Sequence, residues 1–163
     1  MSFSQYFPGT LGFFKWIDGT AICNAIKATT WVFPFTETIH ILALAMALGA
    51  MLMINFRLLG IIRNWTPAQM VGQLSGFINW GIWIIIGTGI ILAWAEPLKA
   101  YDNLAFLPKM TLLLLAVVYQ YTLYPKAEKI DQPKIPIWGK LAALVSIGLW
   151  FGVGVMGRAI GFV

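Results

Sequence analysis

Residues 39–62 read IHILALAMALGAMLMINFRLLGII, and this stretch decides the fold. A helix that crosses a membrane needs about 20 mostly apolar residues, whereas a buried strand takes only about 4–8. Three further stretches of similar character follow, at about residues 70–95, 105–124 and 138–162. Their apolar residues do not alternate with polar ones, as they would in the strands of an outer-membrane barrel. The sequence therefore predicts four transmembrane helices.

The composition of the chain indicates the same fold class. Of its 163 residues, 60% are hydrophobic and 10% are charged, while a soluble domain carries about 25% charged residues. A chain this apolar is not disordered, and it has too little charge to cover a soluble surface. Short connections at residues 63–69, 96–104 and 125–137 join the spans. The prediction is an all-α integral membrane protein whose four helices form an up-down bundle.

The chain divides into two predicted parts. Residues 36–163 form the transmembrane domain, and residues 1–35 mix apolar and charged positions in the manner of an amphipathic segment at the membrane interface. We expect the WVFP elbow at residues 31–34 to lead into the first span, with Thr36 as its cap. Before the second span, Thr66 and Pro67 are typical of an N-cap and a first helical residue.

The charged residues predict the partners and the orientation. A net charge of +5 is spread between apolar runs, which favours contact with anionic lipid headgroups and excludes a nucleic-acid surface. Loops with more lysine and arginine face the cytoplasm. One face is richer in these residues (Arg63, Lys126, Lys129, Lys134, Lys140) than the other (Lys15, Lys27, Lys99). This bias predicts that both termini lie outside the cytoplasm.

Polar residues at membrane depth are functional candidates, because they are costly there. Two layers are predicted. The outer layer contains Glu37, His40, Thr88, Lys109 and Arg158, and the inner layer contains Asn55, Arg57, Gln73, Asn79, Gln120 and Ser146. Purely structural roles are also open for these residues. The side chains of Arg57, Lys109 and Arg158 can extend to the lipid headgroups. His40 can form a hydrogen bond to a neighbouring helix.

The single histidine limits the chemistry of any metal site. Zinc or copper sites with several histidines are excluded, and one Glu37-x-x-His40 pair falls short of the two copies in di-iron bundles. One histidine can still bind a haem iron when Met, Lys or a second subunit supplies the other axial ligand. The lone Cys23 is interpreted as a small apolar residue. His40 is therefore the candidate haem ligand.

Small and aromatic residues predict how the helices pack. Ala43, Ala47 and Ala50 mark a seam on the first span, and Gly87 and Gly89 mark the second. Such a seam serves close helix packing or a slot for a planar cofactor, and the sequence does not separate these uses. Most Trp and Tyr residues fall at predicted membrane interfaces, Tyr124 among them. Trp80, Trp83 and Trp150 fall inside spans, where we expect them to pack in the bundle or line a site.

Several motifs resemble a family of uncharacterised four-helix membrane proteins of bacteria. Its entry to the first span, W-x-F/Y-P-x-x-E-x-x-H, is matched here by Trp31, Phe33, Pro34, Glu37 and His40. Later motifs are matched by Gly49, by the N-F-R-L-L-G run at residues 55–60, by Thr88 and Gly89, by Asn103, Phe106 and Lys109, and by Trp150, Gly157, Arg158 and Ile160. The resemblance covers about residues 24–162 and implies a location in the bacterial inner membrane.

Two positions depart from the family pattern, and both lie in the inner layer. Asn55 stands where the family has an aspartate, and Gln120 stands where it commonly has an asparagine. The layout is also distantly similar to membrane protoporphyrinogen oxidases and to CopD-type copper-resistance proteins. This similarity implies that His40 ligates a haem with Lys109 near it, and copper handling is the weaker implication.

Two hypotheses about function follow. In the first, the protein is a membrane redox or electron-transfer protein that binds haem b or a quinone at His40. Glu37 orients the imidazole, Thr88 contributes to the same site, and Lys109 and Arg158 pair with haem propionates or an anionic quinone oxygen. In the second, it is a non-catalytic accessory or scaffold subunit, packed against other membrane subunits or against further copies of itself. A small-solute transporter is disfavoured because no inverted repeat of broken helices is visible.

Overall fold

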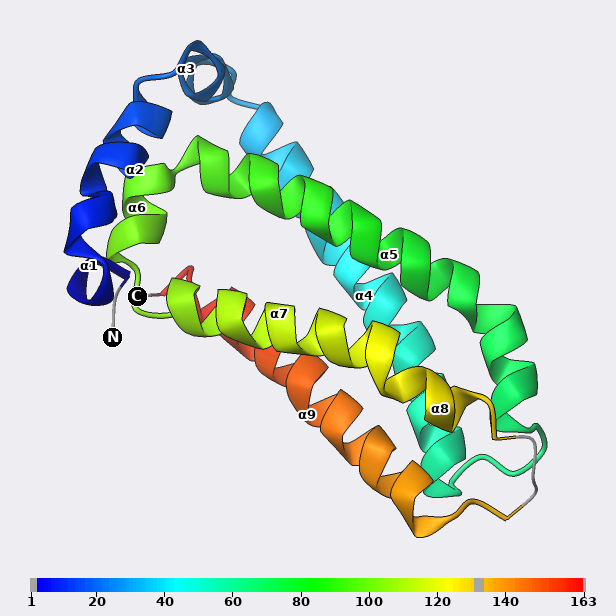
Figure 1. Ribbon diagram of the computed structural model, residues 1–163. Coiled ribbons are helices and arrows are strands. Elements are labelled where there is room, and N and C mark those ends of the chain that lie inside the picture. Colours follow the sequence, from blue (N-terminus) through cyan, green and yellow to red (C-terminus); the bar gives the residue numbers. More distant parts are fainter. Residues whose placement is uncertain (1–2, 131–133, 163) are drawn as a thin grey trace.

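Long apolar segments give this chain a helical fold, and a computed structural model describes residues 3–130 and 134–162 (Figure 1). Throughout these residues the secondary structure is helical and no strand occurs. The long helices are α4 (Val32–Leu59), α5 (Pro67–Ala95), α7 (Phe106–Thr122) and α9 (Ile137–Ala159). The short ones are α1 (Phe3–Tyr6), η1 (Pro8–Thr10), α2 (Leu11–Asp18), α3 (Ala21–Ala28), α6 (Pro97–Asp102) and α8 (Tyr124–Glu128).

Three helices in the described residues are long and apolar enough to cross a membrane, namely α4, α5 and α9. The predicted spans at 39–62, 70–95 and 138–162 coincide with them to within a few residues, except that α4 begins earlier. The predicted span at 105–124 corresponds to α7, which has 17 residues. At about 1.5 Å per residue, α7 reaches less far than the roughly 30 Å of a hydrocarbon core. A fourth transmembrane span therefore stays a prediction.

The long helices are arranged around α4. Helix α4 packs along α5 on one side and along α9 on another, and α7 lies mainly against α9. Figure 1 shows α5 and α7 well apart at the end where α6 connects them, and α8 then brings the chain back to α5 and α9 at the opposite end. The chain runs up and down as predicted, but a closed four-helix bundle is not established.

Small residues allow α4 and α5 to approach closely. Ala43, Ala47 and Ala50 are all buried, so the predicted seam on α4 is confirmed. Its counterpart on α5 is Gly81, where an added Cβ would lie 2.7 Å from the Cβ of Ala47. Gly87, which the sequence suggested for this role, faces open space. The two backbones therefore meet where neither helix carries more than a methyl group.

The ends of α4 and α5 follow from local sequence. The predicted cap of α5 is confirmed, because the Thr66 hydroxyl accepts from the Gln69 amide and the Gln69 side chain accepts from the Thr66 amide. Gly60 has φ of +86° and ends α4 in a left-handed conformation that favours glycine. The predicted elbow and the Thr36 cap are wrong, because α4 begins at Val32 and Thr36 is buried within it. Pro34 fits this first turn, where the helix makes no use of its missing N–H.

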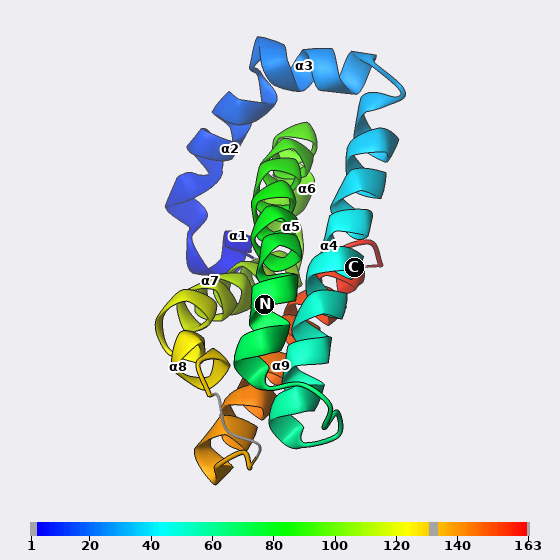
Figure 2. The same cartoon turned by 90° about the vertical axis from the view of Figure 1, so that its right-hand side faces the viewer.

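The N-terminal helices wrap around α6 and the end of α5. Figure 2 shows α2 and α3 forming an arch that passes over this end before the chain enters α4. The Phe14 and Tyr101 rings lie 5.0 Å apart, and the Trp94 indole donates to the Thr20 hydroxyl over 3.2 Å. Cys23 is fully buried here, as its interpretation as a small apolar residue required. Whether this segment lies at a membrane interface stays a prediction.

The outer surface of the long helices is strongly apolar. Trp80 and Trp83 are 70% and 66% exposed, so the expectation that they pack in the bundle is wrong. Trp150 is 2% exposed and joins the main core. The difference arises because the angular position of a residue around its helix, rather than its depth along the axis, decides what it faces.

Candidate functional site

The His40 ring is held by Thr88 across the α4–α5 seam. The Nδ1 atom of His40 lies 2.7 Å from Oγ1 of Thr88, and the same oxygen lies 2.6 Å from the Ile84 carbonyl. A carbonyl only accepts hydrogen bonds, so the single hydroxyl hydrogen of Thr88 goes to Ile84. Oγ1 must then accept from an Nδ1–H group. This arrangement assigns the Nδ1-protonated tautomer and leaves the lone pair on Nε2.

Gly89 makes room for the same ring. A Cβ added at Gly89 would lie 3.4 Å from Cε1 of His40, so the imidazole packs directly against the backbone of α5. The neighbouring residues Thr88 and Gly89 thus fix the ring by a hydrogen bond and by contact. His40 is half-buried.

Lys109 lies in the first turn of α7. Its side chain is half-buried and passes over Gly157 of α9, where an added Cβ would lie 3.6 Å from Cε and 3.7 Å from Nζ. Asn103 ties these helices together, because its side chain donates to the Ile160 carbonyl over 3.0 Å and accepts from the Ala105 amide over 2.9 Å. The start of α7 and the end of α9 thereby place the ammonium group.

Glu37 and Arg158 lie on the surface instead. Glu37 is exposed on α4, and it is Thr88 that bonds Nδ1 of His40, so the orienting role of Glu37 stays a prediction. Arg158 is exposed, and its guanidinium lies 4.7 Å from the centre of the Phe162 ring. The structure therefore joins His40 to Thr88, places Lys109 against Gly157 of α9, and leaves Glu37 and Arg158 exposed.

A second polar cluster is buried near the other end of the helices. The Tyr124 hydroxyl donates to Oδ1 of Asn55 over 2.5 Å, and Nδ2 of Asn55 donates to the Ser146 hydroxyl over 3.2 Å. All three residues are at most 1% exposed. Arg57 is also buried, and its Nε donates to the Trp65 carbonyl, so it does not extend to the headgroups.

Sequence reasoning placed Tyr124 at the membrane interface and overlooked Glu128. A signal for both was present, since Gln120, Tyr124 and Glu128 are spaced at i, i+4 and i+8, which is one face of a continuing helix. In the structure the Gln120 amide donates to Glu128 over 3.3 Å. Burial raises the pKa of the Glu128 carboxyl.

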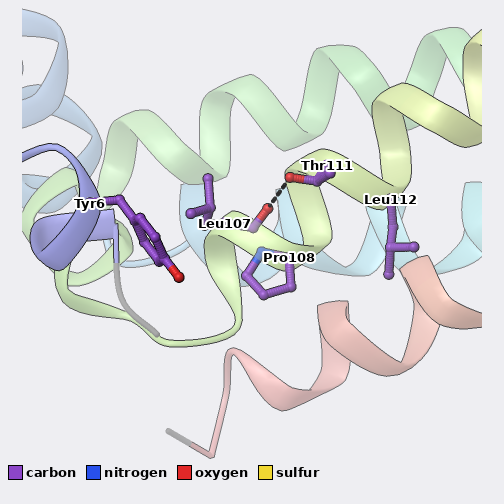
Figure 3. Close-up of a pocket in the computed structure, with 5 residues that line it drawn as sticks. All are labelled: Tyr6, Leu107, Pro108, Thr111 and Leu112. Atoms are coloured by element: carbon purple, nitrogen blue, oxygen red, sulfur yellow. Dashed lines mark hydrogen bonds between the residues drawn. The ribbon is translucent and has the colours of Figure 1, made fainter.

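Two cavities lie away from the His40 ring. The larger, about 370 Å³, lies between α1 and the start of α7 and is mainly apolar. Figure 3 shows the Tyr6 ring facing Pro108, with the Thr111 hydroxyl directed to the Leu107 carbonyl. The smaller, about 190 Å³, is lined by Ser75, Ile78, Asn79, Gln120, Tyr121, Pro125 and Glu128. Within the described residues, no group of three or more His, Cys, Asp or Glu side chains could hold a metal ion.

Comparison with known proteins identifies the family of this chain but assigns no function to it. No curated protein and no solved structure matches the chain. The model of DUF6644, a family of unknown function, matches residues 13–163, which is most of the chain and includes every long helix. The chain therefore belongs to the DUF6644 family.

Proposed function

We propose that this protein is a membrane redox or electron-transfer protein that binds haem b or a quinone at His40. One observation carries the proposal. The Nδ1–H of His40 is committed to Thr88, so the Nε2 lone pair is left for a ligand. A ring nitrogen fixed through a hydrogen bond at the other nitrogen is the usual arrangement of a metal-bound histidine.

The residues fit haem b as a group bound at the protein surface. His40 would hold the haem iron through Nε2, and the Lys109 ammonium would pair with a propionate. Neither of the two cavities is lined by His40, which is half-buried. Bound haem would supply one-electron transfer.

A quinone fits the same groups in a different way, one group for each redox state. The Nε2 lone pair would accept a hydrogen bond from a hydroxyl of the quinol form, and the Lys109 ammonium would donate to a carbonyl oxygen of the quinone form. The apolar cavity beside Pro108, next to Lys109 in the chain, has room for the first part of an isoprenoid tail. In both versions the chain binds the head group between α4 and α7 and orients it through His40.

Removal of the His40 ring is expected to abolish cofactor binding. Purified wild-type protein should carry a Soret band in its absorption spectrum, or a quinone in its organic extract, and His40→Ala should carry neither. Thr88→Val should weaken binding by about 10–100-fold, the usual effect of losing the bond that orients a ligand histidine. Thr122→Val is the matched control, because its hydroxyl also bonds the carbonyl four residues earlier, but at the far end of α7.

Two outcomes would overturn the proposal. One is well-folded wild-type protein without haem or quinone, even after addition of either to the membranes during expression. The other is His40→Ala protein that retains the wild-type amount of cofactor. A change in Thr122→Val as large as that in Thr88→Val would assign the effect to helix stability rather than to His40.

We propose a matching membrane topology. Three helices cross the bilayer by length and composition, and the apolar α7 makes the fourth crossing. The lysine- and arginine-rich end near Arg63 and Lys126 then faces the cytoplasm of a bacterium, and both termini are periplasmic. Cysteine-accessibility labelling of single-cysteine variants at Lys99 and Lys126 should place them on opposite sides of the inner membrane.

A second candidate function, as a subunit of a larger assembly, is supported by the outer face of α5. Phe77, Trp80 and Trp83 are exposed there, close to the middle of a 29-residue helix. Tryptophan prefers the interface to the centre of a bilayer, so central exposed indoles favour contact with another protein. Native mass spectrometry in mild detergent should detect a complex or homo-oligomer that Trp80→Leu/Trp83→Leu weakens. A stable wild-type monomer would count against this function.

A further inference from the structure

The smaller cavity lies at the opposite end of the helices from His40. Its walls come from three elements: Ser75 and Asn79 from α5, Gln120 and Tyr121 from the end of α7, and Glu128 from α8. It lies outside the site of the proposed function and shares no residue with it. At about 190 Å³, it has room for about six molecules at the roughly 30 Å³ that a water occupies in the liquid.

Gln120 beside this cavity has an unsatisfied acceptor. The residue is 5% exposed, and its Nε2 donates to Oε1 of Glu128 over 3.3 Å. That contact fixes which end of the amide is the oxygen, because a carboxylate accepts and does not donate. Oε1 of Gln120 is then buried with no hydrogen-bond partner in the described part of the chain. A buried acceptor without a donor is destabilising, so the site is short of a donor.

Glu128 adds a partly buried negative charge to the same wall. Burial raises the pKa of its carboxyl, which means that the ionised form is desolvated there. The ion pairs seen in the described residues, Lys27–Asp18 and Lys99–Glu96, both lie at the other end of the molecule. The Tyr121 hydroxyl is already directed to Oδ1 of Asn79 over 3.1 Å. The cavity therefore offers acceptors and a negative charge, and it needs a cation that donates hydrogen bonds.

We propose that this cavity binds a primary ammonium group, held by the Glu128 carboxylate and by the side-chain carbonyl of Gln120, which is buried beside the cavity and turns toward the ligand when it binds. An ammonium has three donors, and Ser75, which also lines the cavity, carries a hydroxyl that can act as a third acceptor. The volume admits a group the size of ethanolamine. A quaternary ammonium has no N–H group, so it cannot donate a hydrogen bond to these acceptors. The ammonium can belong to a lipid headgroup, as in phosphatidylethanolamine, or to a small free amine, since the chemistry at Gln120 and Glu128 is the same.

Selectivity between amines tests the proposal without any variant. Thermal unfolding of the full chain in detergent, followed by tryptophan fluorescence, should show a saturable rise in Tm with ethanolamine and no such rise with choline at equal ionic strength. Nanodiscs that contain phosphatidylethanolamine should stabilise the protein more than nanodiscs of phosphatidylcholine. A response to the lipid alone assigns the lipid as the source, and a response to free ethanolamine assigns a soluble amine. No response to either, or an equal response to choline, overturns the proposal.

The variant Glu128→Gln separates ligand binding from folding. Because the folded-state pKa of Glu128 lies above the unfolded value of 4.5, the wild type loses stability as the pH rises above 4.5 through the folded pKa. The neutral glutamine does not carry this cost. In amine-free buffer at pH 7 we therefore expect Glu128→Gln to be at least as stable as the wild type, and to have lost the Tm response to ethanolamine.

Two further variants complete the design. Gln120→Leu should weaken the response, and Glu96→Gln is the matched control, because Glu96 is an exposed carboxylate paired with Lys99 at the other end. The control should keep the full wild-type response. An unchanged response in Glu128→Gln would contradict the proposed site, whatever happens at His40.

Discussion

Replacement of Gly81 by alanine is expected to destabilise the protein by about 1–3 kcal/mol, the usual cost of forcing a methyl group into a packed interior. The new Cβ would lie 2.7 Å from Cβ of Ala47 and 3.2 Å from the Ala43 carbonyl oxygen. Neither atom belongs to a flexible side chain, so α4 and α5 must separate. Within a membrane, helices associate through such close packing and not through a hydrophobic force. The free energy of unfolding, measured by titration with SDS, should therefore fall.

A rescue variant tests this mechanism directly. The double variant Ala47→Gly/Gly81→Ala moves one methyl group from α4 to α5 and removes the shortest contact. It should recover part of the loss, with a coupling energy of about 0.5–3 kcal/mol in the double-mutant cycle. Gly76→Ala is the control, since a Cβ there meets nothing within 4 Å. An additive cycle, or a Gly76→Ala variant as unstable as Gly81→Ala, would refute close packing as the cause.

The second large effect is expected at Tyr124. Tyr124→Ala removes a fully buried ring and should cost about 3–5 kcal/mol, as for other large aromatic residues in cores. Tyr124→Phe keeps the ring and leaves Oδ1 of Asn55 without its donor, which should cost about 1–3 kcal/mol. Thermal unfolding in detergent measures both variants.

Tyr119→Phe is the matched control for the hydroxyl of Tyr124. The Tyr119 hydroxyl donates to the Ala142 carbonyl over 2.9 Å, but the residue is only half-buried. Its loss should cost about 1 kcal/mol or less, the net value of an ordinary hydrogen bond. Equal losses of stability in Tyr119→Phe and Tyr124→Phe would show that the buried Asn55–Tyr124 hydrogen bond contributes no more to stability than the half-buried one of Tyr119.

The sequence predicted those parts of the fold that depend on local chemistry. The apolar runs gave the long helices, and the Thr66-Pro67 pair gave the cap of α5, because both signals act within a few residues. The partner of Ala47 was missed, since several glycines on α5 were equally eligible and only the angular match between two helices selects Gly81. Trp80 and Trp83 were wrongly placed in the interior of the bundle, because their angular position around α5 relative to the other helices was not known from the sequence.

The sequence predicted which residues belong to the candidate site, but it did not predict which of them contact one another. His40 and Thr88 were both selected as polar groups at membrane depth, but nothing in their separate segments indicated that they would bond. Glu37 was expected to orient the ring because it lies one turn away on the same helix, yet the partner came from across the seam. Tyr124 was assigned to the interface by a rule for tyrosines, which takes no account of the turn from α7 into α8.

The unequal lengths of the helices have a consequence for the surrounding lipid. At about 1.5 Å per residue, the 17 residues of α7 reach about 26 Å and the 29 residues of α5 reach about 44 Å. In the proposed topology, a bilayer with a core of about 30 Å cannot match both helices, so α5 would tilt while the lipid beside α7 would thin. When two molecules bring their α7 faces together, one region of thinned lipid surrounds both helices, whereas two separate molecules would each need such a region. Bilayer thickness would then act as a force that pairs these proteins.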